Sequence, residues 1–184
     1  MELITTDYYD ELVERCKQGD TSSYRELYNK YAKAMYNTSL RIVNNTAEAE
    51  DVIQEAFIDA FKHIGGFEGR SSFGAWLKRI VVNKSINSIK RRKINTLDID
   101  AVHTDLSEEE PINEAEFEFK VDEVKKAIND LPAGYRTVLS LYLLEDYSHE
   151  EVATTLNISH STARTQYMRA KQKLLQQLKS RVTV

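Results

Sequence analysis

The sequence predicts an all-α protein of two small helical domains joined by a flexible acidic linker. Apolar residues recur at helical spacing along most of the 184 residues, and no alternating run is long enough to suggest a sheet. One segment is rich in acids, contains Pro111 and has little apolar content. We therefore expect an N-terminal domain over residues 1–94, a linker over 95–113 and a C-terminal domain over 114–184.

Four helices are expected in the N-terminal domain. The first covers about residues 7–17 and ends at Gly19, and the second covers about 22–43. The third begins at Thr46, a candidate N-cap, and continues to Ile64, where Gly65 and Gly66 stop it. After a loop over 65–71, a fourth helix buries one face, formed by Phe73, Trp76, Leu77, Ile80 and Val81.

The linker is marked by its charge. Residues 97–118 contain nine acids and no base, so the remaining chain is basic although the formal net charge is -4. A segment with so little apolar content cannot bury enough surface to offset chain entropy. We expect it to be a mobile tether.

Helices of the C-terminal domain are expected at about 114–129, 132–144, 149–156 and 160–178. Pro132 suits a first helical turn, and Ser148 with Glu151 has the spacing of a capping box. Asn157 can adopt the left-handed conformation that ends a helix, and Ser159 can cap the next one. These proportions predict a helix-turn-helix.

The outward face of the last helix is polar or basic and has no acids. It carries Ser161, Thr165, Met168, Arg169 and Gln172, flanked by Arg164, Lys171 and Lys173. Small hydroxyls with Arg and Lys are suited to base edges and phosphates in the major groove, although an ordinary solvated helix would also be polar here. We favour DNA binding because the capped first helix, the short turn and the acid-free face occur together.

Two further surfaces are candidates in the N-terminal domain. Ile58 lies in the middle of a polar helix face, where it is either an ordinary exposed residue or the centre of a protein-binding patch. Residues 62–93 carry nine bases and one acid, a net +8. This block could hold a nucleic-acid backbone, while the role of Phe67 in the loop stays open between core packing and surface contact.

Other classes fit less well. The single Cys indicates a reducing compartment, no apolar run is long enough to span a membrane, and the N-terminus is acidic, so we expect a cytoplasmic protein that does not insert into a membrane. No metal-ligand spacing, activated nucleophile or phosphate-binding Gly loop is found in the sequence. We therefore expect no enzyme activity, no cofactor and no metal.

Three blocks of sequence resemble the extracytoplasmic-function (ECF) sigma factors of bacterial RNA polymerase. They are residues 51–57 (DVIQEAF), residues 67–83 (FEGRSSFGAWLKRIVVN), and the segment from Leu131-Pro132 to residues 169–171 (RAK). The resemblance covers about residues 8–94 and 118–178, and the first two blocks are more specific than the helix-turn-helix. It implies a promoter-specificity subunit that binds polymerase core and promoter DNA.

The resemblance also implies roles for individual residues. Binding to the polymerase clamp falls to Asp51, Gln54, Glu55 and Ile58. Melting and binding of the minus-ten element fall to Phe67, Arg70, Ser71, Ser72, Arg79, Asn83, Lys84 and Asn87. Reading of the minus-thirty-five element falls to Ser161, Thr162, Arg164, Thr165, Met168 and Arg169.

Regulation in such proteins most simply comes from a separate anti-sigma factor, and the free chain is expected to be a monomer. The alternative is an operator-binding regulator that uses the same helix-turn-helix, with an N-terminal domain that senses a ligand or dimerises. That alternative leaves the basic block and the Ile58 surface unexplained.

Overall fold

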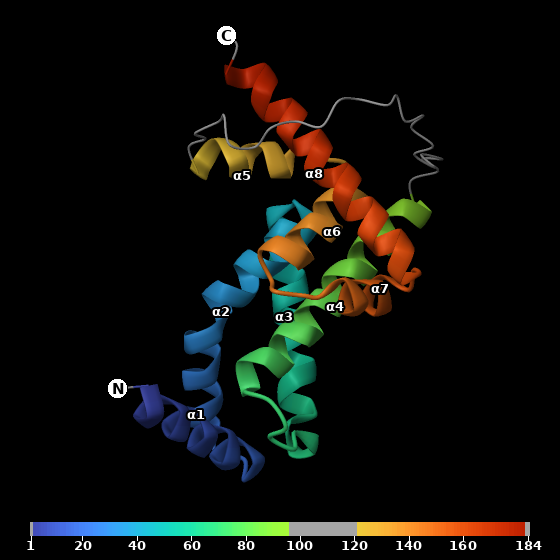
Figure 1. Cartoon of the computed structure of the whole chain (residues 1–184). Helices are drawn as coiled ribbons and strands as arrows, with labels where there is room; N and C mark the ends of the chain where they lie inside the picture. Colours follow the sequence, from blue (N-terminus) through green and yellow to red (C-terminus); the bar gives the residue numbers. More distant parts are fainter. Residues whose placement is uncertain (1, 96–120, 183–184) are drawn as a thin grey trace. The chain divides into compact units, whose positions relative to one another are not determined.

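The computed structural model describes the backbone of residues 2–95 and 121–182, and the side chains of 10–92 and 121–180. Eight α-helices form within these ranges, which confirms the all-α prediction (Figure 1). The chain divides into two compact units, Met1–Ile89 and Lys90–Val184. The predicted linker over 95–113 lies, apart from its first residue, outside the described residues.

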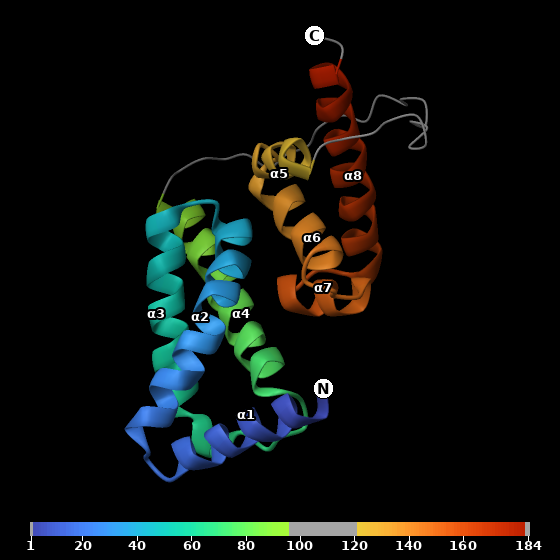
Figure 2. The same ribbon diagram turned by 90° about the vertical axis from the view of Figure 1, so that its left-hand side faces the viewer.

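The N-terminal unit contains α1 (Glu2–Lys17), α2 (Thr21–Val43), α3 (Thr46–Lys62) and α4, which spans Phe73–Asn95. In both ribbon views α2, α3 and α4 run alongside one another, and α1 lies across one end of them (Figures 1 and 2). A 3-10 turn, η1 (Ile64–Gly66), follows α3. The 3-10 turn η1 contacts α1, so the loop between α3 and α4 begins beside α1.

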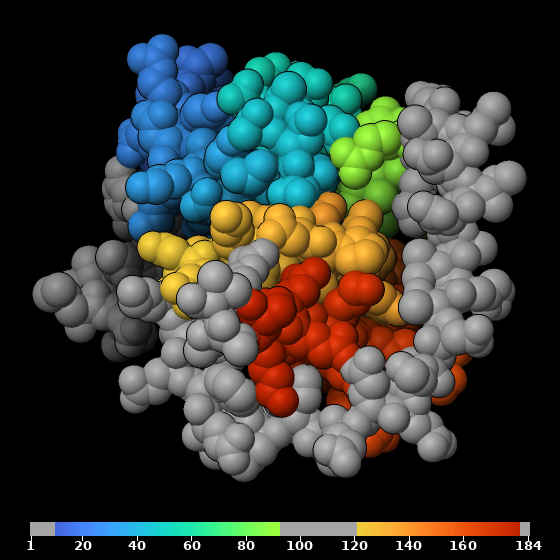
Figure 3. Space-filling model, turned by 90° about the horizontal axis from the view of Figure 1, so that it is seen from above, coloured from blue at the N-terminus to red at the C-terminus, as the bar shows by residue number. Residues whose placement is uncertain are grey.

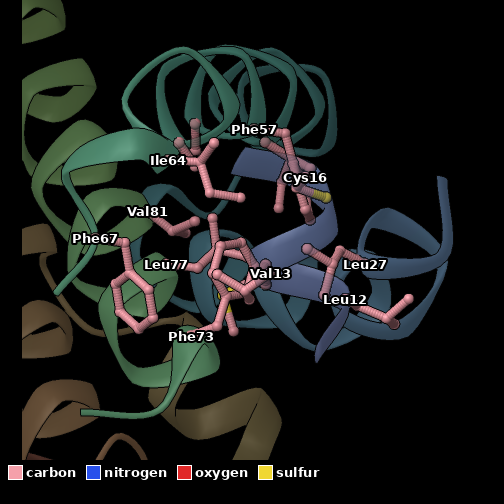
Figure 4. Close-up of a cluster of buried hydrophobic side chains, with 14 of the residues drawn as sticks. Leu12, Val13, Cys16, Leu27, Phe57, Ile64, Phe67, Phe73, Leu77 and Val81 are labelled. Atoms are coloured by element: carbon pink, nitrogen blue, oxygen red, sulfur yellow. The ribbon is translucent and has the colours of Figure 1, made fainter. Parts of the chain in front are cut away.

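The core of this unit is a continuous cluster of aliphatic and aromatic side chains. Leu12 and Val13 of α1 belong to the same cluster as Leu77 and Val81 of α4, and all four are almost fully buried (Figure 4). Ser85 Oγ of α4 lies 3.0 Å from Ser39 Oγ of α2 and donates to the carbonyl oxygen of Val81 at 2.8 Å. Burial of this pair is tolerated because each hydroxyl has a partner.

Two expected helix boundaries of this unit differ in detail. The N-cap of α3 is Asn45, whose backbone is extended and whose side-chain oxygen accepts from the backbone N–H of Glu48 at 3.0 Å, so the prediction of Thr46 is wrong by one residue. The α3 helix ends at Lys62 rather than at Ile64, and Gly65 and Gly66 are the last two residues of the 3-10 turn η1. The positive φ in the loop belongs to Gly69, at 71°.

The C-terminal unit contains α5 (Val121–Asn129), α6 (Ala133–Leu143), α7 (His149–Leu156) and α8 (His160–Val182). Ala127, Ile128 and Leu131 pack against Leu174 and Leu178 of α8. Figure 3 shows the yellow atoms of α5 directly against the red atoms of α8. Pro132 is the N-cap of α6, one residue before the first turn.

The predicted helix-turn-helix is confirmed in its local geometry. Ser148 and Glu151 form both hydrogen bonds of a capping box at the start of α7. Asn157 ends α7 with φ 57° and ψ 51°, in the left-handed region. Ser159 Oγ accepts from the backbone N–H of Thr162 at 3.0 Å and caps α8. Each of these features is fixed by side chains within a few residues.

Within residues 2–95 and 121–182, no helix is long and apolar enough to cross a membrane. The same ranges hold no group of three His, Cys, Asp or Glu residues placed to bind a metal ion.

Candidate functional site

The outward face of α3 is the first candidate surface. Asp51, Gln54, Glu55 and Ile58 are all exposed on it. The opposite face of α3 is buried and consists of Ala49, Val52, Ile53, Ala56, Phe57 and Ala60. Ile58 is 65% exposed, more than any other large apolar residue described in the N-terminal unit. A polar rim around one exposed aliphatic side chain is the composition of a small protein-binding patch.

Lys84 does not lie free on the surface of α4. Its Nζ is 2.6 Å from Asp59 Oδ2 and 3.5 Å from Glu55 Oε2, and its side chain is only 21% exposed. The hydrogen bond from Lys84 lowers the pKa of Asp59, and the one to Asp59 raises the pKa of Lys84. Lys84 therefore joins α4 to α3 and touches Glu55, a residue of the α3 surface.

The loop between α3 and α4 exposes four polar residues, one of which is Glu68. Arg70, Ser71 and Ser72 are exposed, and Arg70 Nε lies 2.6 Å from Glu68 Oε2. Ser72 Oγ accepts from the backbone N–H of Ala75 at 3.2 Å and so closes the first turn of α4. Ser71 Oγ donates to the carbonyl oxygen of Ser72 at 3.5 Å, so Arg70, Ser71 and Ser72 all have partners within the loop or the first turn of α4.

Phe67 lies in the core of the N-terminal unit, whereas the resemblance implies a contact with minus-ten DNA. Its side chain is 8% exposed, with ring centroids 5.9 Å from Phe73 and 5.2 Å from Trp76 (Figure 4). Lys17 Nζ of α1 lies 5.9 Å from the Phe67 ring centroid. Phe67 thus fixes the loop against α1 and α4 and offers no open ring face for a base in this conformation.

The outward face of α4 carries a polar row. Arg79, Asn83 and Asn87 are exposed and spaced four residues apart, so they follow one line along the helix. Their neighbours Val82 and Ile86 are buried. The row begins close to the polar loop in sequence, and one basic and two amide side chains can donate to phosphates and base edges.

On α8 the structure exposes five of the six predicted residues. Ser161, Thr162, Arg164, Thr165 and Met168 are exposed, and Met168 reaches 57%. The Oγ atoms of Ser161 and Thr162 lie 2.9 and 2.7 Å from Ser159 Oγ. Ala163 and Ala170 on the opposite side are fully buried, so the helix has one outward polar face.

Arg169 differs from the other predicted residues of α8. It is half-buried, and its Nε is buried without a hydrogen-bond partner. Only part of this side chain is therefore presented on the outward face.

Sequence reasoning missed two features. Asp59 was not assigned to a surface, because its role depends on Lys84 of another helix. The stack of Tyr142 on His149 in the C-terminal unit was also missed, since nothing in their spacing predicts it.

Family models match both units. The model of Sigma-70 region 2 matches residues 27–94, and the model of Sigma-70, region 4, matches residues 122–174. Together they span well over half of the chain.

Curated relatives match nearly the whole length. The RNA polymerase sigma-H factor of Pseudomonas aeruginosa is 32% identical over 180 residues, which cover 92% of this chain and 93% of that protein. The ECF RNA polymerase sigma factor SigW of Bacillus subtilis is 29% identical, with 91% and 95% covered. The ECF RNA polymerase sigma-E factor of Escherichia coli K12 is 30% identical, with 88% and 89% covered.

Solved structures share the fold. The sigma factor RpoE of Bartonella quintana, crystallised with the anti-sigma factor NepR, gives a TM-score of 0.58 at 23% identity, with 86% of this chain and 98% of that chain covered. CnrH in complex with the cytosolic domain of CnrY gives a TM-score of 0.56 at 21% identity, with 92% and 96% covered. With both sigma regions matched in order and near full-length relatives at about one-third identity, the chain belongs to the extracytoplasmic-function sigma factors of bacterial RNA polymerase.

Proposed function

We propose that this sigma factor brings RNA polymerase core to its promoters through three separate surfaces. The outward face of α3 binds polymerase, the polar loop with the α4 row binds the melted minus-ten element, and the outward face of α8 reads the minus-thirty-five element. The observation that carries the proposal is Ile58, 65% exposed at the centre of the acidic and amide face of α3.

The α3 face suits a basic partner with an apolar pocket. Asp51 and Glu55 supply negative charge, Gln54 supplies hydrogen bonds, and Ile58 supplies apolar area that water must leave on binding. Interface energy concentrates in a few such buried residues, while the charged rim sets orientation and association rate.

The α4 row and the loop suit single-stranded DNA. Opening a promoter requires unstacking at a cost of about a few kcal/mol for each flipped base. Arg70 and Arg79 can neutralise phosphates, while Asn83 and Asn87 can donate to and accept from base edges. Phe67 supports this surface from beneath rather than by direct contact, since it is buried.

The α8 face suits the major groove. Its N-terminal end carries the short hydroxyl side chains of Ser161, Thr162 and Thr165, which permit close approach to the bases, and Arg164 and Met168 follow within two turns. Polymerase bound to α3 would hold both DNA-binding surfaces at a fixed separation and make their binding bivalent.

We further propose control by an anti-sigma factor that covers these faces. Two proteins of similar fold were solved in complexes. RpoE was crystallised with the anti-sigma factor NepR, and CnrH was solved with the cytosolic domain of CnrY. Transcription initiation takes place on the chromosome, so we place the chain in the cytoplasm, as a monomer when no partner is bound.

The proposal is tested by titrating purified core polymerase with Asp51→Arg and Ile58→Ser. Each variant should bind core polymerase about tenfold more weakly or worse, because each removes a central contact or reverses its charge. Glu11→Arg is the matched control, since Glu11 is exposed on α1 and lies outside the α3 face. The emission of the single Trp, Trp76, reports whether the N-terminal unit remains folded.

Promoter-specific transcription by the reconstituted holoenzyme is the second readout. Wild-type protein should direct core polymerase to defined start sites, and the two α3 variants should lose this activity together with polymerase affinity. Unchanged affinity in both variants would remove the α3 face from the proposal. Promoter binding without any effect on initiation would favour an operator-binding regulator instead.

A further inference from the structure

A cluster of three charged side chains joins α4 to the edge of the outward face of α3. Lys84 Nζ of α4 lies between two carboxylates of α3, 2.6 Å from Asp59 Oδ2 and 3.5 Å from Glu55 Oε2. Glu55 and Asp59 are four residues apart, so their side chains are neighbours on the helix surface. Glu55 also belongs to the face proposed to bind polymerase, and the cluster reaches that face through it.

The two contacts of Lys84 are unequal. Its contact with Asp59 is a short, charge-assisted hydrogen bond, which lowers the pKa of Asp59 and raises the pKa of Lys84. Its contact with Glu55, at 3.5 Å, is longer than an ordinary N–H···O hydrogen bond. Water reaches Glu55, because about half of its side chain is exposed. Asp59 therefore anchors Lys84, whereas the contact with Glu55 can be exchanged.

A basic partner of α3 has to compete with Lys84 for Glu55. In the free chain the Lys84 ammonium offsets part of the Glu55 charge, and a cation of the partner gains the full attraction only after it replaces Lys84. Exposed ion pairs of this kind change an equilibrium constant by a factor of about 1.4 to 5. The competition is therefore small enough to be overcome on binding and large enough to be measured.

We propose that Lys84 is a positioning residue for polymerase binding, which is anchored by Asp59, holds Glu55 in the free chain and gives it up to a basic side chain of the polymerase. This inference rests on the proposed function of the α3 face. It gives Lys84 a role in polymerase binding, in place of the contact with minus-ten DNA that the resemblance implies. A lysine that turned to DNA would have to leave Asp59, its hydrogen-bond partner.

Removal of either partner of the anchoring ion pair should change polymerase affinity, in opposite directions. Lys84→Met removes the competitor for Glu55 and should bind core polymerase about twofold to fivefold more tightly. Asp59→Asn removes the anchor, leaves Lys84 to pair with Glu55 alone, and should bind about twofold to fivefold more weakly. Both substitutions break the same ion pair, so a purely structural role predicts no gain in affinity from either. Lys84→Arg keeps the charge and should bind like the wild type.

A double-mutant cycle shows whether Lys84 acts through Glu55. Glu55→Gln should weaken binding by itself, and Lys84→Met added to it should give no more than about half of the gain that it gives in the wild-type chain. Lys90→Met is the matched control, because Lys90 is exposed on the same helix, six residues or about 9 Å further along its axis. This control removes the same charge from α4 and should leave polymerase affinity unchanged.

The affinities are measured by competition. Each unlabelled variant displaces an N-terminally labelled wild-type chain from purified core polymerase, and the displacement is followed by fluorescence anisotropy. The buffer contains about 0.15 M salt, which screens charges that lie more than about 8 Å apart. Urea denaturation followed by the fluorescence of Trp76 gives the folded fraction of each variant, so that affinity is compared between folded chains.

The outcomes separate this inference from the proposed function. Weaker or unchanged binding of Lys84→Met would overturn the inference, and so would a gain of equal size in the Glu55→Gln chain, which would reflect a general effect of charge. Unchanged binding of Glu55→Gln would overturn it as well. In each of these cases the proposed function stands if Asp51→Arg and Ile58→Ser lose polymerase affinity, and it fails only if they do not.

Discussion

Gly74 permits a close approach between α2 and α4, and replacing it tests the packing beneath the polar loop. A Cβ at this position would lie 2.7 Å from Cε1 of the Tyr31 ring, with two further ring atoms at 3.4 and 3.5 Å. Ordinary contacts begin at 3.4 Å, so the ring would have to move by about 0.7 Å to restore an ordinary contact. The Tyr31 ring also packs against Phe73, with centroids 5.6 Å apart.

Two effects of opposite sign set the stability of Gly74→Ala. Alanine in a helix gains up to about 1 kcal/mol over glycine, and less in the first turn where Gly74 lies. Overpacking costs about 1–3 kcal/mol, and a weakened aromatic pair costs about 0.5–1.5 kcal/mol. The weakened aromatic pair is partly included in the overpacking cost, so the two costs do not add in full. After the gain in helix propensity is subtracted, we expect a net destabilisation of about 1–2 kcal/mol.

The assay is urea denaturation followed by the fluorescence of Trp76, which lies two residues from Gly74 and is the only Trp of the chain. Gly134→Ala is the matched control, since Gly134 is also the second residue of a helix and its Cβ would meet nothing within 4 Å. Gly134→Ala should raise the stability of the C-terminal unit by about 0.4–1 kcal/mol in far-UV circular dichroism and leave the Trp76 transition unmoved. If the midpoint of the Trp76 transition in Gly74→Ala lies at the same urea concentration as in the wild type, or at a higher one, the packing argument is refuted.

Two further predictions concern single side chains. Ser148→Ala removes the hydrogen bond that the Ser148 side chain makes in the capping box of α7, and it should destabilise the C-terminal unit by about 1 kcal/mol in thermal melts. Ser148→Asp can still cap the helix and should retain most of the stability. Equal melting temperatures of Ser148→Ala and wild type would contradict the role of the cap. Burial raises the pKa of the Cys16 thiol to about 11, so iodoacetamide at pH 8 should alkylate it rapidly only in denaturant, and fast reaction of the native chain would contradict its burial.

The helices could be predicted from the sequence because their signals are local. The bounds of α7 follow from Ser148 at one end and Asn157 at the other, and both act through neighbouring backbone groups. The one-residue error at α3 has the same origin, since Asn45 and Thr46 are both good caps. The choice falls to Asn45, whose backbone is extended while that of Thr46 is already helical.

The candidate surfaces were predictable only where helical periodicity decides exposure. Ile58 lies outside the apolar stripe of α3, so its exposure follows from the sequence alone. Phe67 lies in a loop that has no periodicity, and its burial is decided by Lys17, Phe73 and Trp76. The position of Lys84 is decided in the same way by carboxylates on another helix, which no spacing within α4 can indicate.

The ion pairs of Lys84 with Asp59 and Glu55 reduce the number of bases in residues 62–93 that are available to DNA. The contact of Arg70 with Glu68 is highly exposed on both sides, and such pairs contribute little and can exchange for a phosphate at small cost. Lys84 is 21% exposed and held by two carboxylates, so moving it to DNA would leave the charges of Asp59 and Glu55 without their partner. On the proposed minus-ten surface, Arg70 and Arg79 would therefore contact the melted strand, whereas Lys84 joins α4 to Asp59 and Glu55 of α3. Because each phosphate contact contributes separately to the salt dependence of binding, we expect this proposed surface to depend more on Asn83, Asn87 and base contacts than a net charge of +8 suggests.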